Sequence, residues 1–233
     1  MSIHLQKELD RLKEKLLTLS ALVEESVRMA VESVQEKDAE KAQKVVEMDE
    51  EIDAMEIEVE EDCLKILALH QPVAIDLRFI VAVLKLNNDL ERIGDLAVNI
   101  AERTIFELSK LPEEDPIPFD FSEMGQKALA MVRNSLDSLV EKNVDLAWQV
   151  CAADQEVDDL HKEMYTLVRD YIRENPSRFD ILLPLLSVSR QLERIADHAT
   201  NIAEDVIYMI QGDIVRHQSW YKDSQKESSP EEG

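Results

Sequence analysis

The chain has 233 residues with only four glycines, seven prolines and 5% aromatic residues, a composition that indicates long helices and argues against a β-sheet. Its 50 acidic and 26 basic side chains give a net charge of −24, which argues against a nucleic-acid-binding surface because phosphate contacts need a basic footprint. The charge is compatible with binding cations or a basic partner, and equally with a solvated, highly soluble surface.

The first predicted helix covers the N-terminal 36 residues or so and is amphipathic. Its apolar side chains mostly recur at alternating steps of three and four, the pattern of a helix that packs in a bundle. They are Leu5, Leu9, Leu12, Leu16, Leu19, Val23, Ala30 and Val34. The helix ends at "EKDAEKA", where Asp38 can cap the next helix by accepting a hydrogen bond from a free backbone N–H. The similar string "EKNVDLA" follows 105 residues later, with Asn143 as the equivalent cap.

Prolines separate the remaining predicted helices. Pro72 in "HQPVAID" and Pro176 in "ENPSRFD" interrupt helical geometry at matching places, and three prolines in "LPEEDPIPFDFS" mark a linker. The predicted helices after the first are Ala39–His70, Ile75–Lys110, Ser122–Glu141, Val144–Asn175 and Phe179–Gly212. From about residue 218 the sequence loses its periodicity, which predicts a mobile polar tail.

The chain contains an internal duplication. "LERIGDLAVNIAE", which starts at Leu90, returns as "LERIADHATNIAE" at Leu192 with ten of thirteen positions identical. The predicted fold is therefore all-α, with two tandem three-helix bundles built from six long antiparallel helices. The bundles cover residues 1–110 and 122–217, joined by a linker at 111–121 and followed by a tail at 218–233. A pseudo-twofold axis or a translation could relate them.

The sequence contains no charged-then-apolar leader and no apolar run of the roughly 18 residues that cross a bilayer. We therefore expect a cytoplasmic protein without membrane insertion. The two cysteines fit neither a disulfide framework nor a zinc pattern, and Cys63 has the spacing of a core residue.

Repeated carboxylates lie beside the apolar seams of the second and third helix of each repeat. Counted from the turns near residues 73 and 177, they fall at similar heights, so four carboxylates are expected at one level in each half. They are Asp49, Asp53, Glu91 and Asp95 in the first half, and Asp154, Asp158, Glu193 and Asp197 in the second. Whether they line the groove between the two helices or lie outside it depends on the handedness of the bundle.

Two interpretations of these carboxylates remain open. Like charges four residues apart repel on a helix, and hard cations such as Fe, Mn, Mg or Ca are held by facing carboxylates in helical bundles. Alternatively, the repeated Arg92 and Arg194 neutralise the acids in ordinary surface ion pairs. His198 and His161 have no counterpart in the first repeat: a helix-surface role is favoured for His198, while His161 could join the second site.

The doubled "LERI-x-D" strings, with "MDEEID" and "ADQEVD" on the helices before them, resemble the PhoU family over about residues 3–215. The resemblance implies a cytoplasmic, commonly homodimeric regulator that links the ATPase subunit of the phosphate transporter to a sensor histidine kinase and keeps the phosphate-starvation response off. It further implies multinuclear clusters of iron, zinc or another divalent cation. Their ligands would be Asp49, Asp53, Glu91, Asp95, Asp154, Asp158, Glu193 and Asp197.

Three functions are compared. The first is a non-catalytic regulator, since the sequence has no Gly-rich phosphate loop and no nucleophile beside a plausible base. The second is a ferritin-like carboxylate-bridged metal oxidase or iron store, although such bundles use Glu-x-x-His and this chain offers only Asp158-x-x-His161. The third is an acidic helical scaffold that holds no metal.

Overall fold

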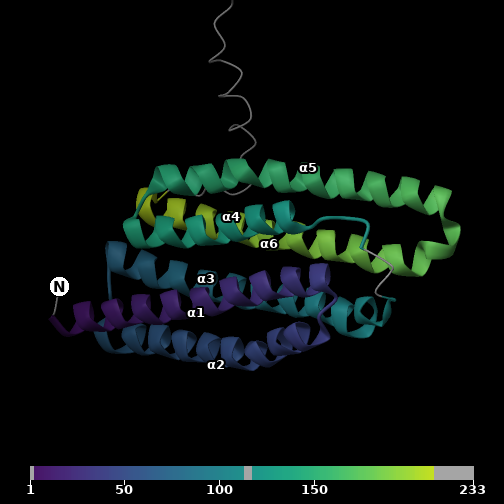
Figure 1. The fold of residues 1–233 in the computed structure, drawn as a ribbon. Coiled ribbons are helices and arrows are strands. Elements are labelled where there is room, and N and C mark those ends of the chain that lie inside the picture. Colours follow the sequence, from purple (N-terminus) through teal and green to yellow (C-terminus); the bar gives the residue numbers. More distant parts are fainter. Residues whose placement is uncertain (1–2, 113–116, 213–233) are drawn as a thin grey trace, which may run out of the picture.

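Six long helices make up the computed structural model, which describes residues 3–112 and 117–212 and has no strand in those ranges (Figure 1). The helices are α1 (Ile3–Glu36), α2 (Ala39–His70), α3 (Ala74–Phe106), α4 (Ser122–Glu141), α5 (Val144–Glu174) and α6 (Phe179–Gln211), with short 3₁₀ turns η1 (Leu108–Lys110) and η2 (Pro176–Arg178). The predicted fold class and internal repeat are confirmed. The tail predicted at 218–233 lies outside the described residues.

The third helix ends earlier than the sequence predicted. It stops at Phe106 instead of continuing to Lys110, because the backbone at Glu107 adopts φ −127° and ψ −59°. This change of direction starts the 3₁₀ turn η1 and places Leu108 in the core, where it is 1% exposed. The ends of α5 and α6 each differ from the prediction by a single residue.

The same compact turn joins the first two helices of both repeats. In the first repeat Lys37 adopts a left-handed conformation with φ 53°, and the N–H groups of Lys37 and Asp38 donate to the carbonyls of Val34 and Ser33. Asp38 then accepts hydrogen bonds from the first turn of α2, as predicted. Asp38 thus bonds a carbonyl at the end of α1 through its N–H and caps α2 through its side chain. A connection of two residues is therefore sufficient.

Lys142 and Asn143 repeat this turn between α4 and α5. Lys142 has φ 54°, and the N–H of Asn143 donates to Ser138 O at 2.9 Å. The Asn143 side chain accepts from the backbone N–H of Leu146, so the second predicted cap is also confirmed.

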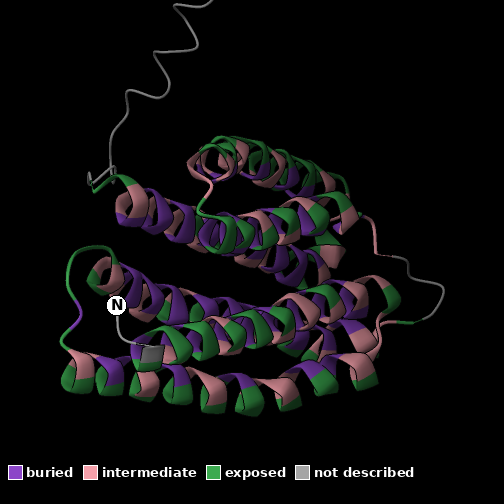
Figure 2. Cartoon of the chain, turned by 90° about the vertical axis from the view of Figure 1, so that its left-hand side faces the viewer, coloured by how far each residue is buried: buried purple, intermediate pink, exposed green. Residues whose placement is uncertain are grey.

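Four helices form one layer in the order α2, α3, α6, α5. α1 packs against α2 and α3, α4 packs against α5 and α6, and α1 and α4 touch each other, so both lie on the same side of the layer. Figure 2 shows the buried residues along the inward sides of the helices. Cys63 is fully buried in this core, as expected.

The two repeats meet through α3 and α6, which run in opposite directions. Arg78 Nε donates to the carbonyl of Met209 at the start of α3, and Asp89 contacts His198 near the middle. Because α3 and α6 are equivalent helices in the two repeats and pair antiparallel, the repeats are related by a pseudo-twofold axis and not by a translation. Within the described residues no helix is long and apolar enough to cross a membrane.

Candidate functional site

The four carboxylates of the first repeat come together in the groove between α2 and α3, which we call the first acidic groove. Asp49 on α2 is repelled by Asp53 on its own helix and by Asp95 on α3. Glu91 on α3 is repelled by Asp95 and, across the groove, by Asp53. The predicted common level is therefore correct, and the carboxylates interact across the groove.

Burial and mutual repulsion disfavour the charged forms of these carboxylates. Desolvation, followed by the charges of Asp53 and Asp95, raises the pKa of Asp49 to about 6. Desolvation also raises the pKa of Glu91 and of Glu56, which lies one turn further along α2. A proton or a cation in this groove would relieve the repulsion.

The second acidic groove lies between α5 and α6 and contains Asp154, Asp158, Glu193 and Asp197. Desolvation and the charges of Asp158 and Asp154 raise the pKa of Glu193. The pKa of Asp197 is raised as well, by desolvation and by Glu193 and Asp158, although Asp197 is an exposed residue. The duplication has thus produced two grooves with the same acidic residues.

Both grooves open on the same face of the molecule. Leu90 and Ile93 are fully buried, while Glu91 and Asp95 lie further around α3 and are only partly buried. On α2, Glu58 and Asp62 form ion pairs with Lys15 of α1, whereas Asp53 lies on roughly the opposite side of the helix. The pseudo-twofold axis repeats this arrangement on α6. The face of the α2–α3–α6–α5 layer that α1 and α4 leave uncovered therefore carries both acidic grooves.

Basic side chains neutralise part of this charge, as the surface ion-pair interpretation expected. Arg92 Nη1 lies 2.9 Å from Asp95 Oδ2, and Arg92 Nε lies 3.4 Å from Glu91 Oε2. In the second groove Lys162 lies 3.6 Å from Asp158. The charges of Arg190 and Arg194 favour ionised Glu193, and the charge of Arg194 also favours ionised Asp197. Glu91 Oε2 is nevertheless buried and accepts no hydrogen bond from any described residue.

The donor chemistry of the grooves suits hard cations, because all eight predicted ligands are carboxylates and a metal ion would relieve their repulsion. The side chains are not positioned as a ready-made site: among the described residues no group of three or more His, Cys, Asp or Glu is arranged to hold a metal ion. Metal binding would require these side chains to reorient within their grooves.

The two histidines unique to the second repeat have separate contacts. His198 Nδ1 lies 2.8 Å from Asp89 Oδ1, so it links α6 to α3 across the two repeats. This contact was not predicted from the sequence, although Asp89 and His198 both interrupt the repeat pattern, where Gln191 and Leu96 are their counterparts. His161 Nδ1 lies 3.0 Å from Ser189 Oγ.

The chain is all-helical and consists of two three-helix repeats, each with carboxylates that face one another across a groove. These features place it in a class of duplicated helical-bundle proteins with paired acidic grooves. The sequence profile of the PhoU domain matches the chain twice, at residues 16–104 and 121–206. The chain therefore belongs to the PhoU family.

Individual relatives agree with this assignment. The chain is 36% identical over 210 residues to the phosphate-specific transport system accessory protein PhoU homolog 1 of Thermotoga maritima, covering 90% of each chain. It is 40% identical over 213 residues to the PhoU homolog of Pseudomonas putida, covering 90% of this chain and 82% of that one. The crystal structure of PhoU from Pseudomonas aeruginosa superimposes with a TM-score of 0.83 at 38% identity, covering 89% of this chain and 99% of the other.

Proposed function

We propose that this protein is a non-catalytic regulator of phosphate uptake and of phosphate-starvation signalling, and that it bridges the ATPase subunit of a phosphate ABC transporter and a sensor histidine kinase. The observation that supports this most directly is its similarity, over about nine-tenths of the chain, to accessory proteins of the phosphate-specific transport system. In this role the protein acts in the cytoplasm, as a homodimer.

Binding to the two purified partners tests the proposal. The full-length chain is immobilised and exposed to the ATPase subunit and to the cytoplasmic part of the sensor kinase, each alone and then together. We expect both to bind, and the ternary mixture to form a single larger species in size-exclusion chromatography. Failure to bind either partner would contradict the bridging role, and analytical ultracentrifugation of the protein alone tests the dimer.

We further propose that the two acidic grooves bind divalent cations, with Asp49, Asp53, Glu91 and Asp95 holding one cluster and Asp154, Asp158, Glu193 and Asp197 the other. Burial and mutual repulsion together raise the pKa of Asp49 and of Glu193, and this supports the proposal because a cation would offset the repulsion. Iron, zinc or another divalent metal would supply positive charge that fixes each groove in one conformation. The chain's own contribution is eight carboxylates on two pairs of helices.

A ferritin-like oxidase is the competing function. Its imidazole ligand would have to come from His161, whose Nδ1 contacts Ser189 Oγ. Iron-dependent oxygen consumption by the purified protein would support the oxidase and count against a purely regulatory role.

A further inference from the structure

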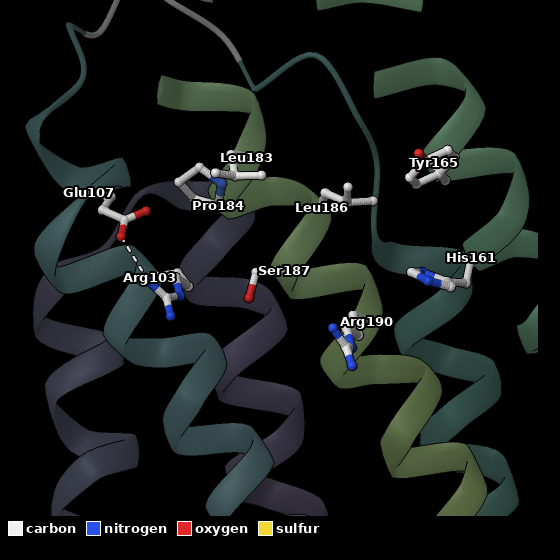
Figure 3. A pocket seen from close by; sticks show the side chains of 9 residues that line it. All are labelled: Arg103, Glu107, His161, Tyr165, Leu183, Pro184, Leu186, Ser187 and Arg190. Atoms are coloured by element: carbon white, nitrogen blue, oxygen red, sulfur yellow. Dashed lines mark hydrogen bonds and ion pairs between the residues drawn. The ribbon is translucent and has the colours of Figure 1, made fainter. Parts of the chain in front are cut away.

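A cavity of about 540 Å³ lies where the end of α3 meets α5 and the first half of α6. Figure 3 shows Arg103 and Glu107 on α3, Ser187 and Arg190 on α6, and His161 and Tyr165 on α5 around it. The volume falls in the range of small-molecule sites, which combine an apolar lining with a few polar groups. None of its lining residues belongs to the eight carboxylates of the acidic grooves.

The cavity has an excess of positive charge in a strongly acidic protein. Arg190 is exposed and makes no hydrogen bond or ion pair with any described residue. Arg103 donates from Nη1 to Glu107 Oε1 at 2.9 Å, but Arg103 Nε and Glu107 Oε2 are both buried without a hydrogen-bond partner in the described part of the chain. The charge of Arg190 acts on Glu193 and His161, but its hydrogen-bond donors have no partner among the described residues and can bind an anion. Arg103 has hydrogen-bonding capacity left.

The hydrogen bonds of His161 define its role in the cavity. Ser189 Oγ donates its hydrogen to the carbonyl of Leu186, so it accepts from His161 Nδ1. Burial, with smaller contributions from Arg190 and Lys162, lowers the pKa of His161, while Asp158 opposes the shift. A neutral imidazole protonated on Nδ1 leaves Nε2 as an acceptor, which suits a hydroxyl group of a ligand.

The first repeat has opposite chemistry at the equivalent place. The counterparts of His161 and Tyr165 are Glu56 and Glu60, and the counterpart of Arg190 is Asn88. Arg103 corresponds to Asp205 on α6, which forms an ion pair with Lys85 at 3.1 Å. The two repeats agree in their acidic grooves but differ here. Glu56, Glu60 and Asn88 are replaced by His161, Tyr165 and Arg190, while Lys85 and Met209 are the counterparts of Ser187 and Glu107.

We propose that this cavity is a binding site for a phosphate group, carried by a small molecule or free in solution. Its donors are Arg103 on α3 and Ser187 and Arg190 on α6, and guanidinium groups pair closely with phosphate oxygens. His161 Nε2 on α5 can accept from the hydroxyl that a protonated phosphate carries and a carboxylate lacks. Tyr165, Leu183 and Leu186 form an apolar wall that can cover an organic group attached to the phosphate. This site goes beyond the regulatory role and does not depend on it.

Isothermal titration of the full-length protein with AMP, inorganic phosphate and adenosine tests the site. We expect saturable binding of AMP below roughly 1 mM and no binding of adenosine. Arg190→Asn, which introduces the first-repeat residue, should weaken AMP binding at least about tenfold because a charge-assisted hydrogen bond is lost. Arg194→Asn, one turn further along α6 and with the same charge change, should alter it less than about twofold.

Tyr165→Ala distinguishes the two sources of phosphate. If a phosphorylated molecule is the ligand, this change weakens AMP several-fold and leaves inorganic phosphate unaffected. Equal affinity for phosphate and AMP, with the same loss in Arg190→Asn, identifies free phosphate as the ligand. The site is refuted if neither AMP nor phosphate binds, or if Arg190→Asn and Arg194→Asn weaken binding equally. Arg190 and Tyr165 are exposed, so these variants keep the core intact.

Discussion

Gly94 on α3 lies directly against Ile52 on α2: a β-carbon added to Gly94 would be 3.3 Å from Ile52 Cγ2 and 3.4 Å from Cδ1. It would also lie 3.6 Å from Asp49 Oδ1, so the glycine sits beneath the first acidic groove. The equivalent pair in the second repeat is Ala196 and Val157, both fully buried. Each pair has the same total number of side-chain carbon atoms, so the two repeats fill this contact in complementary ways.

Gly94→Ala should therefore destabilise the protein by about 1 kcal/mol. Crowding against Ile52 costs roughly 1–3 kcal/mol and exceeds the 0.5–1 kcal/mol that alanine contributes to a helix. In an Ile52→Val background the same change should stabilise, because the pair then matches that of the second repeat. Urea unfolding of the two single variants and the double variant should give a coupling energy of about 1 kcal/mol or more, and additive effects would refute the contact.

The raised pKa of Asp49 predicts a specific dependence of stability on pH. Its carboxyl group has an ordinary pKa of 3.8 when unfolded and about 6 when folded. Between these values the folded state binds more protons, so this group's contribution to the free energy of unfolding is greatest below about pH 4 and is lost as the pH rises through 6.

Asp49→Asn should thus raise the free energy of unfolding at pH 7 by about 1–2 kcal/mol, after allowing for partial solvent exposure of the carboxyl group. The variant should also show a flatter decline in stability from pH 4 to pH 6. Urea unfolding at several pH values measures both effects. A variant that is less stable than the wild type at pH 7, with an unchanged slope, would contradict the burial and repulsion assigned to Asp49.

Loading with Zn²⁺ or Fe²⁺ should stabilise the protein, because a cation offsets the repulsion in each acidic groove. Saturation should raise the melting temperature by roughly 5–10 °C, and EDTA should reverse the change. Asp95→Asn and Asp197→Asn should each remove about half of the metal measured by ICP-MS, and the double variant nearly all of it.

Asp159→Asn is the matched control for metal binding. Asp159 lies beside Asp158 on α5 but is exposed and pairs with Lys162. The Asp159→Asn substitution should leave the metal content unchanged. If no metal remains after desalting and Asp95→Asn stabilises the protein, the grooves are repulsive without binding cations.

The Asp89–His198 contact should stabilise the association of the two repeats. Only 15% of the Asp89 side chain and 20% of the His198 side chain are exposed. His198→Leu, which introduces the first-repeat residue, should lower the free energy of unfolding by about 1.5–3 kcal/mol because Asp89 loses its partner. A double-mutant cycle with Asp89→Asn tests this, and a coupling energy near zero would exclude the contact as a stabilising one.

Much of the fold could be predicted because its boundaries depend on local chemistry. Asp38 and Asn143 cap helices, and Pro72 and Pro176 exclude helical geometry in the residue before them, so the sequence locates these ends directly. The end of α3 at Phe106 could not be predicted in this way. It depends on the burial of Leu108 in a core that forms only when the helices pack.

The acidic grooves could be predicted because counting residues from a helical turn gives the height of each side chain. Their position across the groove, and the antiparallel pairing of α3 with α6, depend on how helices pack, which periodicity does not encode. The phosphate-site residues Arg103, His161 and Arg190 come from three helices and are separated by up to 87 positions in the chain. Only the folded structure brings them together.

The pairing of α3 with α6 also bears on the origin of the molecule. Each repeat presents its third helix to the same helix of the other repeat, as the subunits of a symmetric dimer do. A half-length ancestor would have carried a self-complementary surface and could have built this architecture from two separate copies. Fusion of the genes then freed each copy to change independently, and the loss of negative charge between Glu56 and its counterpart His161 is the kind of divergence that a dimer of identical subunits cannot acquire.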